Sequence, residues 1–314
     1  MNIIFFGSSE FAVKPLEALI KRGYNICCVV TQPDRKKGRH LHLEGTAVKQ
    51  LAREHQLKVL QPVNINSPEA LLFLRKLEAD LFVVISYGQI LSGQVLLAPK
   101  LFAVNAHASL LPKYRGAAPI NWAIIRGEKT SGISIIKMTE KMDAGPIIAQ
   151  KSLNIEDGDD ASSLEEKLSA LAADMIVACI ESIKNNSYKL TPQPTQGISL
   201  APKLRKNDGL IDWDKTAQEI NNLVRACVKW PGAFTHYKGK LLKIYKAQVT
   251  KPQSHKTTSK PGEIIWISKE EIVVATQEGA LRILELQPEG KRRMLTAEFI
   301  SGHKISSGEN FSKT

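Results

Sequence analysis

Short apolar segments alternate with amphipathic segments near the start of the chain, and this alternation constrains the fold more than any other feature. The apolar segments are 2–6, 26–31, 58–60 and 81–86, and the segments with helical spacing are the run ending at residue 21, 46–54 and 68–77. Strands that alternate with helices predict an α/β fold with a mostly parallel, doubly wound sheet. The first turn, Gly7-Ser-Ser-Glu, lacks the Gly-x-Gly-x-x-Gly pattern, so no dinucleotide is expected there.

A further strand-like run, residues 101–104, is followed by two polar side chains. Alternate residues of a strand project from the same face, so Asn105 and His107 are expected side by side. Open α/β sheets bind ligands at the carboxyl ends of their strands. There, a carboxamide donor beside an imidazole can stabilise the negative charge that develops on a carbonyl oxygen. An isolated Asn-x-His is more often a turn former followed by a core histidine, so this pair alone does not decide the function.

The longer string around this pair resembles the signature of the folate-dependent formyltransferases. The string is Asn105-Ala-His107-Ala-Ser109-Leu-Leu-Pro112-Lys-Tyr-Arg-Gly, and Met-Asp143-Ala-Gly comes later in the chain. In that family an Asn, a His and an Asp with this order and separation surround the transferred formyl group, which implies that Asn105, His107 and Asp143 are catalytic. Ala108 departs from the pattern, because the family often has glycine there. Residues 132–139 alternate as a strand would and are expected to lead Asp143 to the sheet end that holds His107.

The resemblance also implies a Rossmann-like core and a folate site. The formyl donor in this family is 10-formyltetrahydrofolate, and the loop carrying Tyr87 and Gly88 helps to enclose its pterin end. The segment that lines the folate matches Ser109, Leu110, Leu111 and Pro112. Formyl transfer of this kind needs no metal on the protein. His40-x-His42-x-Glu44 lacks a fourth ligand, so no metal site is expected there.

The loop over residues 32–44 is long and basic, which is typical of a surface arm. A solvated loop would account for most such runs. Family members that act on methionyl-tRNA carry a basic insertion after a Thr-Gln-Pro-Asp-Arg string, and this insertion enters the acceptor stem of the tRNA. Residues 31–35 match that string. The resemblance therefore implies that Arg39, Lys36 and Lys37 bind tRNA.

The C-terminal part of the chain, from residue 185, has a different pattern of predicted elements. Residues 185–200 are rich in Asn, Pro and Gly, which is typical of a connector. A helix is expected over 216–227, and short β-rich runs follow it. Such runs predict a small barrel, and the family places an OB-like barrel here. The sequence thus predicts a catalytic domain (1–188), a linker (189–206) and a smaller OB-like tRNA-binding domain (207–314).

The excess of positive charge is concentrated in the smaller C-terminal part of the chain. Residues 203–314 hold 20 Lys and Arg against 12 Asp and Glu, so they contribute +8 to the net charge of +12. A solvated surface or a polyanionic partner such as RNA would each explain this excess. Lys203 and Lys206, near the domain junction, are the predicted tRNA contacts on this side.

Taken with these features, the resemblance implies an enzyme of translation initiation that formylates initiator methionyl-tRNA. A formyltransferase of the same fold that acts on a sugar nucleotide and a non-catalytic RNA-binding protein are the alternatives. The scattered cysteines, with no Cys-x-x-Cys, indicate a reducing compartment. Without a leader-like or membrane-spanning run, a bacterial cytoplasmic protein with no membrane partner is expected, and we expect a monomer.

Overall fold

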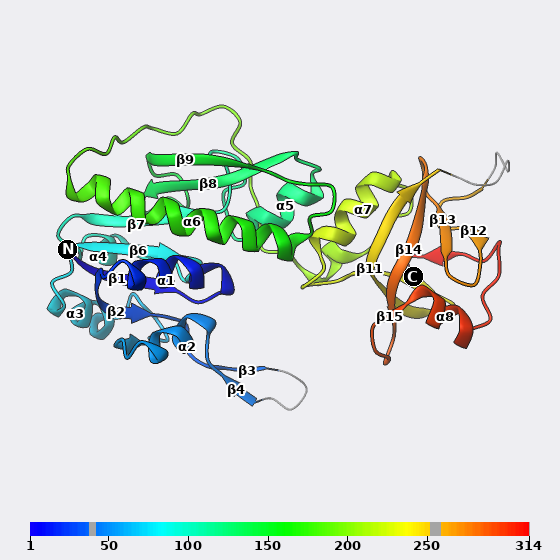
Figure 1. The fold of residues 1–314 in the computed structure, drawn as a ribbon, viewed down its shortest axis with the longest axis horizontal. Coiled ribbons are helices and arrows are strands. Elements are labelled where there is room, and N and C mark those ends of the chain that lie inside the picture. Colours follow the sequence, from blue (N-terminus) through cyan, green and yellow to red (C-terminus); the bar gives the residue numbers. More distant parts are fainter. Residues whose placement is uncertain (38–41, 252–258, 314) are drawn as a thin grey trace. The chain divides into compact units, whose positions relative to one another are not determined.

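The computed structural model describes residues 1–37, 42–251 and 259–313 (Figure 1). The chain forms two compact units. The first comprises residues 1–119, 130–154 and 165–202, and the second comprises residues 120–129, 155–164 and 203–314.

The first unit is built on a seven-stranded sheet with the order β5-β2-β1-β6-β7-β8-β9. Its strands are β1 (Asn2–Gly7), β2 (Asn25–Val30), β5 (Val59–Leu60), β6 (Leu81–Ile85), β7 (Phe102–His107), β8 (Thr130–Lys137) and β9 (Ile147–Asn154). The strands from β5 to β7 are parallel, whereas β8 runs antiparallel to β7 and β9 runs antiparallel to β8. The predicted mostly parallel α/β core is therefore confirmed.

Helices cover both faces of this sheet. They are η1 (Glu10–Ala12), α1 (Val13–Lys21), α2 (Ala47–Glu54), α3 (Pro68–Lys76), α4 (Gly93–Leu96) and α6 (Ala161–Lys184). In Figure 1, α1 and α6 lie across the near face. On the other face, Leu74 of α3 and Val95 of α4 join Ile4, Phe6 and Phe82 in one buried cluster. Burial on both faces explains why the central strands read as continuous apolar runs.

Local signals set the helix starts. The Thr46 side chain accepts a hydrogen bond from Lys49 N at α2, and Ser67 does the same for Ala70 N at α3. Between β2 and α2 the chain forms the hairpin of β3 (Arg35–Lys37) and β4 (His42–Glu44). The basic arm expected over residues 32–44 thus begins as a two-stranded ribbon.

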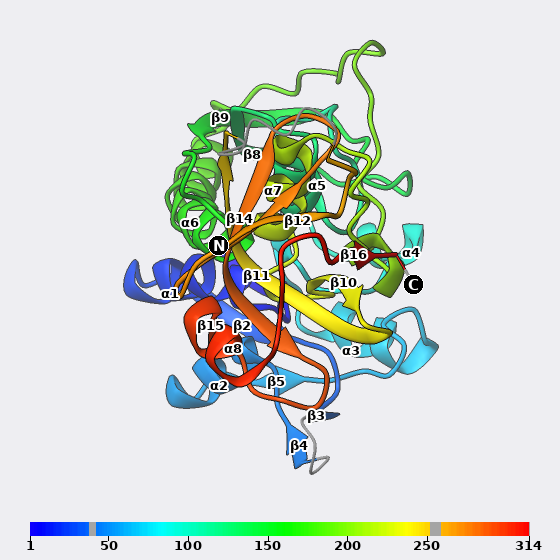
Figure 2. The ribbon, with the colours of Figure 1, turned by 90° about the vertical axis from the view of Figure 1, so that its right-hand side faces the viewer.

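The second unit carries a curled antiparallel sheet with the order β12-β13-β14-β11-β10-β16, and β15 pairs with β14. Its elements are α5 (Pro119–Ile125), η2 (Lys206–Gly209), α7 (Ala217–Ala226), β10 (Ala233–Tyr237), β11 (Lys240–Thr250), β12 (Ile264–Ile267), β13 (Ile272–Ala275), β14 (Ala280–Pro288), β15 (Met294–Leu295), α8 (Thr296–Gly302) and β16 (Phe311–Ser312). Figure 2 shows the strands of this unit from the side, with α8 next to β15. This half-barrel agrees with the predicted OB-like class.

Candidate active site

Strand β7 positions the first two candidate residues. It extends to His107, three residues beyond the expected strand, so Asn105 and His107 lie on the strand itself and on one face of it. Asn105 Nδ2 donates a hydrogen bond to the Val84 carbonyl over 3.0 Å. Its Oδ1 is buried without a hydrogen-bond partner among the described residues. A carboxamide carries two N–H bonds, so one of them is left to donate elsewhere.

The imidazole of His107 is buried, and each of its two nitrogens faces an oxygen atom. Nε2 lies 2.8 Å from the Tyr114 carbonyl oxygen, and a carbonyl only accepts, so Nε2 carries a proton. In the neutral ring, Nδ1 is therefore the unprotonated nitrogen. Nδ1 lies 3.7 Å from Oδ2 of Asp143, whose side chain is 16% exposed. The structure thus brings the predicted histidine and aspartate together.

Asp143 reaches this position by a route that the sequence did not predict. Asp143 lies beside His107 as predicted, but the strand before it does not itself lead to that end of the sheet. Strand β8 runs antiparallel to β7, so its last residue, Lys137, pairs with Val104. The loop over residues 138–146 brings Asp143 back to His107, with Asp143 in the left-handed region at φ +50°.

Backbone geometry holds the Asp143 carboxylate from the other side. Gly116 N donates a hydrogen bond to Asp143 Oδ2 over 2.8 Å. Gly116 has φ +127°, and a Cβ at this position would lie 2.6 Å from the Ala201 carbonyl oxygen. Only glycine fits there, which accounts for the glycine that ends the signature string.

The predicted folate segment, Ser109 to Pro112, is a turn held by several hydrogen bonds. Ser109 Oγ donates to the Lys113 carbonyl over 2.6 Å. From β8, Ser134 Oγ donates to the Ser109 carbonyl and accepts from Leu111 N. From β9, Gln150 Nε2 donates to the Leu111 carbonyl over 3.0 Å. Sequence reasoning missed Ser134 and Gln150, because neither lies in a motif.

The two residues predicted at the pterin end are placed differently from each other. Tyr87 is buried in the core and packs edge-on against Phe6, with ring centroids 5.5 Å apart. Burial raises the pKa of its phenol, which has no hydrogen-bond partner among the described residues. Gly88 has φ +92° and lies against the Gln32 side chain. The backbone of this loop, rather than the Tyr87 ring, is available at the surface of the turn.

The base of the basic arm is tied to the sheet by a carboxylate. The Asp34 side chain accepts hydrogen bonds from Lys49 Nζ, at 2.5 Å, and from Gln61 Nε2, at 2.7 Å. These bonds, first that of Gln61 and then that of Lys49, lower the pKa of Asp34. A charged acceptor shared by two donors fixes where the arm leaves the sheet.

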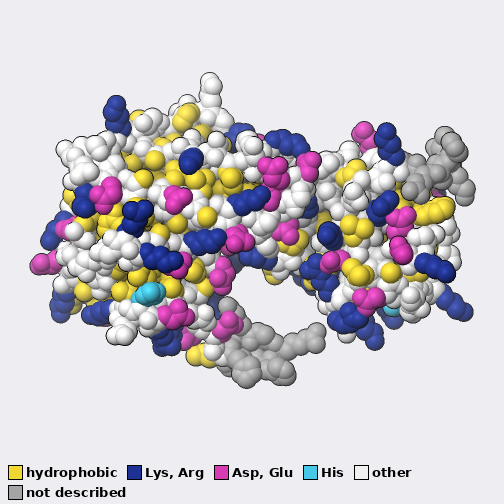
Figure 3. All heavy atoms as spheres, viewed as in Figure 1, with side chains coloured by type: hydrophobic (Ala, Val, Ile, Leu, Met, Phe, Trp, Pro, Cys, Tyr) yellow, Lys and Arg dark blue, Asp and Glu magenta, His cyan; other side chains and the backbone are white. Residues whose placement is uncertain are grey.

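The predicted tRNA-binding residues lie in both units. Lys36 and Lys37 lie on β3, and Arg39 falls outside the described residues. Lys203 and Lys206 are exposed in the second unit. In Figure 3, the basic and acidic side chains of the described residues are interspersed on the visible face of each unit.

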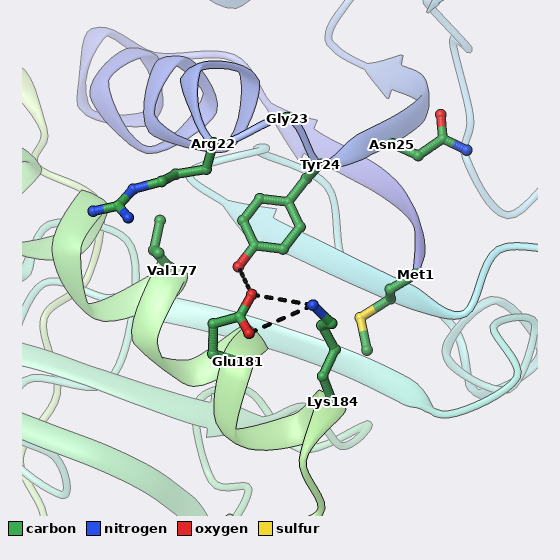
Figure 4. A pocket seen from close by; sticks show the side chains of 8 residues that line it. All are labelled: Met1, Arg22, Gly23, Tyr24, Asn25, Val177, Glu181 and Lys184. Carbon is green, nitrogen blue, oxygen red and sulfur yellow. Dashed lines mark hydrogen bonds and ion pairs between the residues drawn. The ribbon is translucent and has the colours of Figure 1, made fainter.

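A separate hollow lies at the amino-terminal ends of β1 and β2 (Figure 4). Tyr24 and Lys184 both meet the Glu181 carboxylate there, which links α6 to the turn before β2. Burial and the bond to Glu181 raise the pKa of Tyr24 to about 12. The hollow lies at the opposite ends of the strands from the Asn105–His107 site, so it is not the candidate site.

The described residues contain neither a metal-binding cluster nor a membrane-spanning helix. No group of three or more His, Cys, Asp or Glu side chains among them could hold a metal ion. His40 of the His40-x-His42 pattern lies outside those residues. No helix in the described part of the chain has both the length and the apolar composition to cross a membrane.

Two family models match the chain. The model described as formyl transferase matches residues 1–180, and that of the formyl transferase C-terminal domain matches residues 203–304. Methionyl-tRNA formyltransferase of Thermodesulfovibrio yellowstonii is 45% identical over 308 residues, which is 98% of this chain and 97% of the relative. The protein of the same name from Caldanaerobacter subterraneus is 43% identical over 309 residues, covering 98% and 99%.

Solved structures share the fold at lower identity. The N-formyltransferase from Helicobacter canadensis, in complex with folinic acid and dTDP-3-aminofucose, matches with a TM-score of 0.67 and 20% identity over 93% of this chain and 99% of its own. HypX from Aquifex aeolicus, in complex with tetrahydrofolic acid, matches with a TM-score of 0.62 and 17% identity over 98% and 50%. From the two family models and the nearly full-length relatives, this chain belongs to the formyl transferase family and, within it, to the methionyl-tRNA formyltransferases.

Proposed function

We propose that this protein transfers the formyl group of 10-formyltetrahydrofolate to the amino group of methionine on initiator methionyl-tRNA. The observation that carries this proposal is the meeting of the His107 imidazole and the Asp143 carboxylate beside Asn105, in a chain whose close relatives are named for this reaction. The product would be formylmethionyl-tRNA for translation initiation.

In this proposal Asn105 stabilises the oxyanion. When the amine attacks the formyl carbon, negative charge develops on the formyl oxygen. The Asn105 Nδ2–H that is not bonded to Val84 donates to that oxygen. Removing one such donor typically raises the barrier by about 3 kcal/mol, which is about a hundredfold or more in rate.

His107 accepts the proton of the attacking amine, and Asp143 stabilises the imidazolium that forms. With Nε2–H bound to the Tyr114 carbonyl, His107 Nδ1 is the basic nitrogen and takes the proton that the attacking amine loses. The resulting imidazolium is stabilised by Asp143 and can donate from Nδ1 to the oxyanion. As the tetrahedral intermediate collapses, the C–N10 bond breaks and N10 of the folate gains a proton. The proton that the amine gives to His107 is thus balanced by the proton that N10 receives.

The remaining predicted residues would bind the two substrates. Ser109, Leu110, Leu111 and Pro112 would line the folate, with the Tyr87–Gly88 loop at its pterin end. The arm residues Lys36, Lys37 and Arg39, with Lys203 and Lys206, would contact the phosphates of the tRNA. In this scheme residues 1–188 are the catalytic domain, 189–206 the linker and 207–314 the tRNA-binding domain. The protein would act as a cytoplasmic monomer, which light scattering would test against the chain mass of 34.7 kDa.

The test is a substrate panel with purified protein and 10-formyltetrahydrofolate. Initiator methionyl-tRNA, elongator methionyl-tRNA and an amino-sugar nucleotide are offered in separate reactions. Formylation of the initiator tRNA, at a rate well above the other two, is the expected result. Formylation of the sugar nucleotide alone would support the same chemistry with another acceptor. Binding of tRNA without formyl transfer would leave only an RNA-binding role.

A further inference from the structure

A glutamine in the connector after α6 is bonded to the Asp143 loop. Within residues 189–198, all of which the structure describes, Gln193 is half-buried while its neighbours are exposed. Its Nε2 donates to two carbonyl oxygens, those of Asp143 and Gly145, over 2.8 Å each. Both N–H groups of the amide therefore donate to the loop that carries the candidate catalytic carboxylate.

Arg115 fixes the orientation of this amide. Its Nε and Nη2 donate to Gln193 Oε1 over 3.2 and 2.7 Å. A guanidinium only donates and a carbonyl only accepts, so the amide oxygen must face Arg115 and the NH2 must face the loop. The next residue, Gly116, donates its N–H to the Asp143 carboxylate. The Asp143 carboxylate is thus held by Gly116 N, and the Asp143 backbone carbonyl is held by the Gln193 amide.

The loop needs such support. Asp143 has φ +50°, a left-handed conformation that is uncommon for residues other than glycine, although aspartate adopts it more readily than most. Gly145 lies so close to β8 that a Cβ would be 1.8 Å from the Lys137 carbonyl oxygen. A backbone segment in this conformation is stable only where several contacts with its surroundings hold it in place.

The connector itself does not depend on the Gln193 side chain. Thr191 and Ile147 exchange two backbone hydrogen bonds, of 2.8 and 2.9 Å. Further along, the Ser199 carbonyl accepts from Arg115 N, and Ala201 N donates to the Arg115 carbonyl. These bonds anchor the segment on both sides of residue 193, so a change at the side chain should leave its course intact.

We infer that Gln193 is a positioning residue, which holds the Asp143 carboxylate at the distance from His107 that formyl transfer requires. This inference rests on the proposed function. Gln193 touches no substrate in this account and acts only through Asp143. A displacement of about 1 Å of a catalytic group can lower a rate by about a hundredfold.

The test compares Gln193→Glu with Gln196→Glu in formylation of initiator methionyl-tRNA. Glutamate at 193 keeps an oxygen for Arg115 but turns the two donors into an acceptor that repels the Asp143 and Gly145 carbonyls. We expect kcat to fall about ten- to hundredfold, with KM for folate and tRNA within about twofold of wild type. Gln196 is exposed in the same connector, so Gln196→Glu makes the same charge change and should retain wild-type rates.

A double-mutant cycle with Asp143→Asn separates positioning from a merely structural role. If Gln193 acts through the carboxylate, Gln193→Glu lowers the single-turnover rate of the Asp143→Asn protein by less than about twofold. Full additivity, a rise in KM without loss of kcat, or wild-type kcat in Gln193→Glu would each overturn the inference. Gln193→Met, which also removes both donors but adds no charge, should match Gln193→Glu in kcat, and wild-type kcat in it would likewise refute the inference. An inactive wild-type protein would instead refute the proposed function.

Discussion

Replacing Asp143 by Asn removes a charge from the centre of the site while keeping the size of the side chain. The carboxamide oxygen can still accept the hydrogen bond from Gly116 N, which spans 2.8 Å in the structure. What is lost is the attraction between a carboxylate and the imidazolium that forms on His107 during proton transfer, across the 3.7 Å between Oδ2 and Nδ1. The substitution therefore tests the electrostatic role of Asp143 with little change in packing.

The separation of the two atoms sets the expected magnitude. Two unit charges at this distance attract by about 4 kcal/mol at an effective dielectric constant of about 20, and by about 1 kcal/mol in bulk water. Both side chains are largely buried, at 7% and 16% exposure, so the larger figure is the closer one. Since each 1.36 kcal/mol is tenfold in rate, kcat should fall by about tenfold to a thousandfold.

Rapid-quench formylation under single turnover measures this loss directly, alongside KM for both substrates and the thermal midpoint. Asp157→Asn is the matched control, because that side chain is 97% exposed and forms a surface ion pair with Lys129 across 3.3 Å. It should retain wild-type rates. An Asp143→Asn protein with a single-turnover rate within twofold of wild type, or with its entire loss in KM, would refute the reasoning.

Three further predictions concern the rest of the chain. Arg39→Ala should raise KM for tRNA and leave the folate affinity, measured by titration, unchanged. An equal loss of folate affinity would contradict the role of the arm in tRNA binding. Burial of the phenol and its bond to Glu181 raise the pKa of Tyr24 from 10.0 to about 12, so the neutral phenol stabilises the fold fully below pH 10 and this contribution is lost as the pH rises to 12. Denaturant midpoints of wild type and Tyr24→Phe should therefore differ at pH 8 and converge by pH 12, whereas a constant gap would exclude this cause. Burial raises the pKa of three thiols and should protect them, so a disulfide reagent at pH 8 should modify the half-buried Cys27 first and the others only after denaturation; rapid reaction of all four would show that this packing is wrong. The protected thiols are those of Cys28, at about 11, and of Cys179 and Cys227, at about 12.

Much of the fold was predictable because its signals are local. The apolar runs of the central strands and the caps at Thr46 and Ser67 each lie within a few residues of the element that they define. The hairpin of β3 and β4 and the short helix α8 were missed. Charged residues such as those of Arg35–Lys37 carry no apolar alternation, and α8 is too short for a clear helical period.

The site was predictable only in part, for a related reason. The motifs gave Asn105, His107 and Asp143, but alternation along a strand carries no information on its direction, so the antiparallel course of β8 could not be read. Gln193 bonds to a loop some fifty residues earlier in the chain, and such a pairing leaves no local pattern. Contacts of this kind are set by tertiary structure.

The central claim is that a carboxamide and an imidazole on β7 act on the same formyl carbon. The most direct test is the single-turnover rate of formyl transfer to initiator methionyl-tRNA by the Asn105→Ala and His107→Ala proteins, each checked for a native circular dichroism spectrum and for folate binding. Both proteins should bind folate as the wild type does and transfer the formyl group at least about a hundredfold more slowly. Transfer at the wild-type rate by either protein would contradict it.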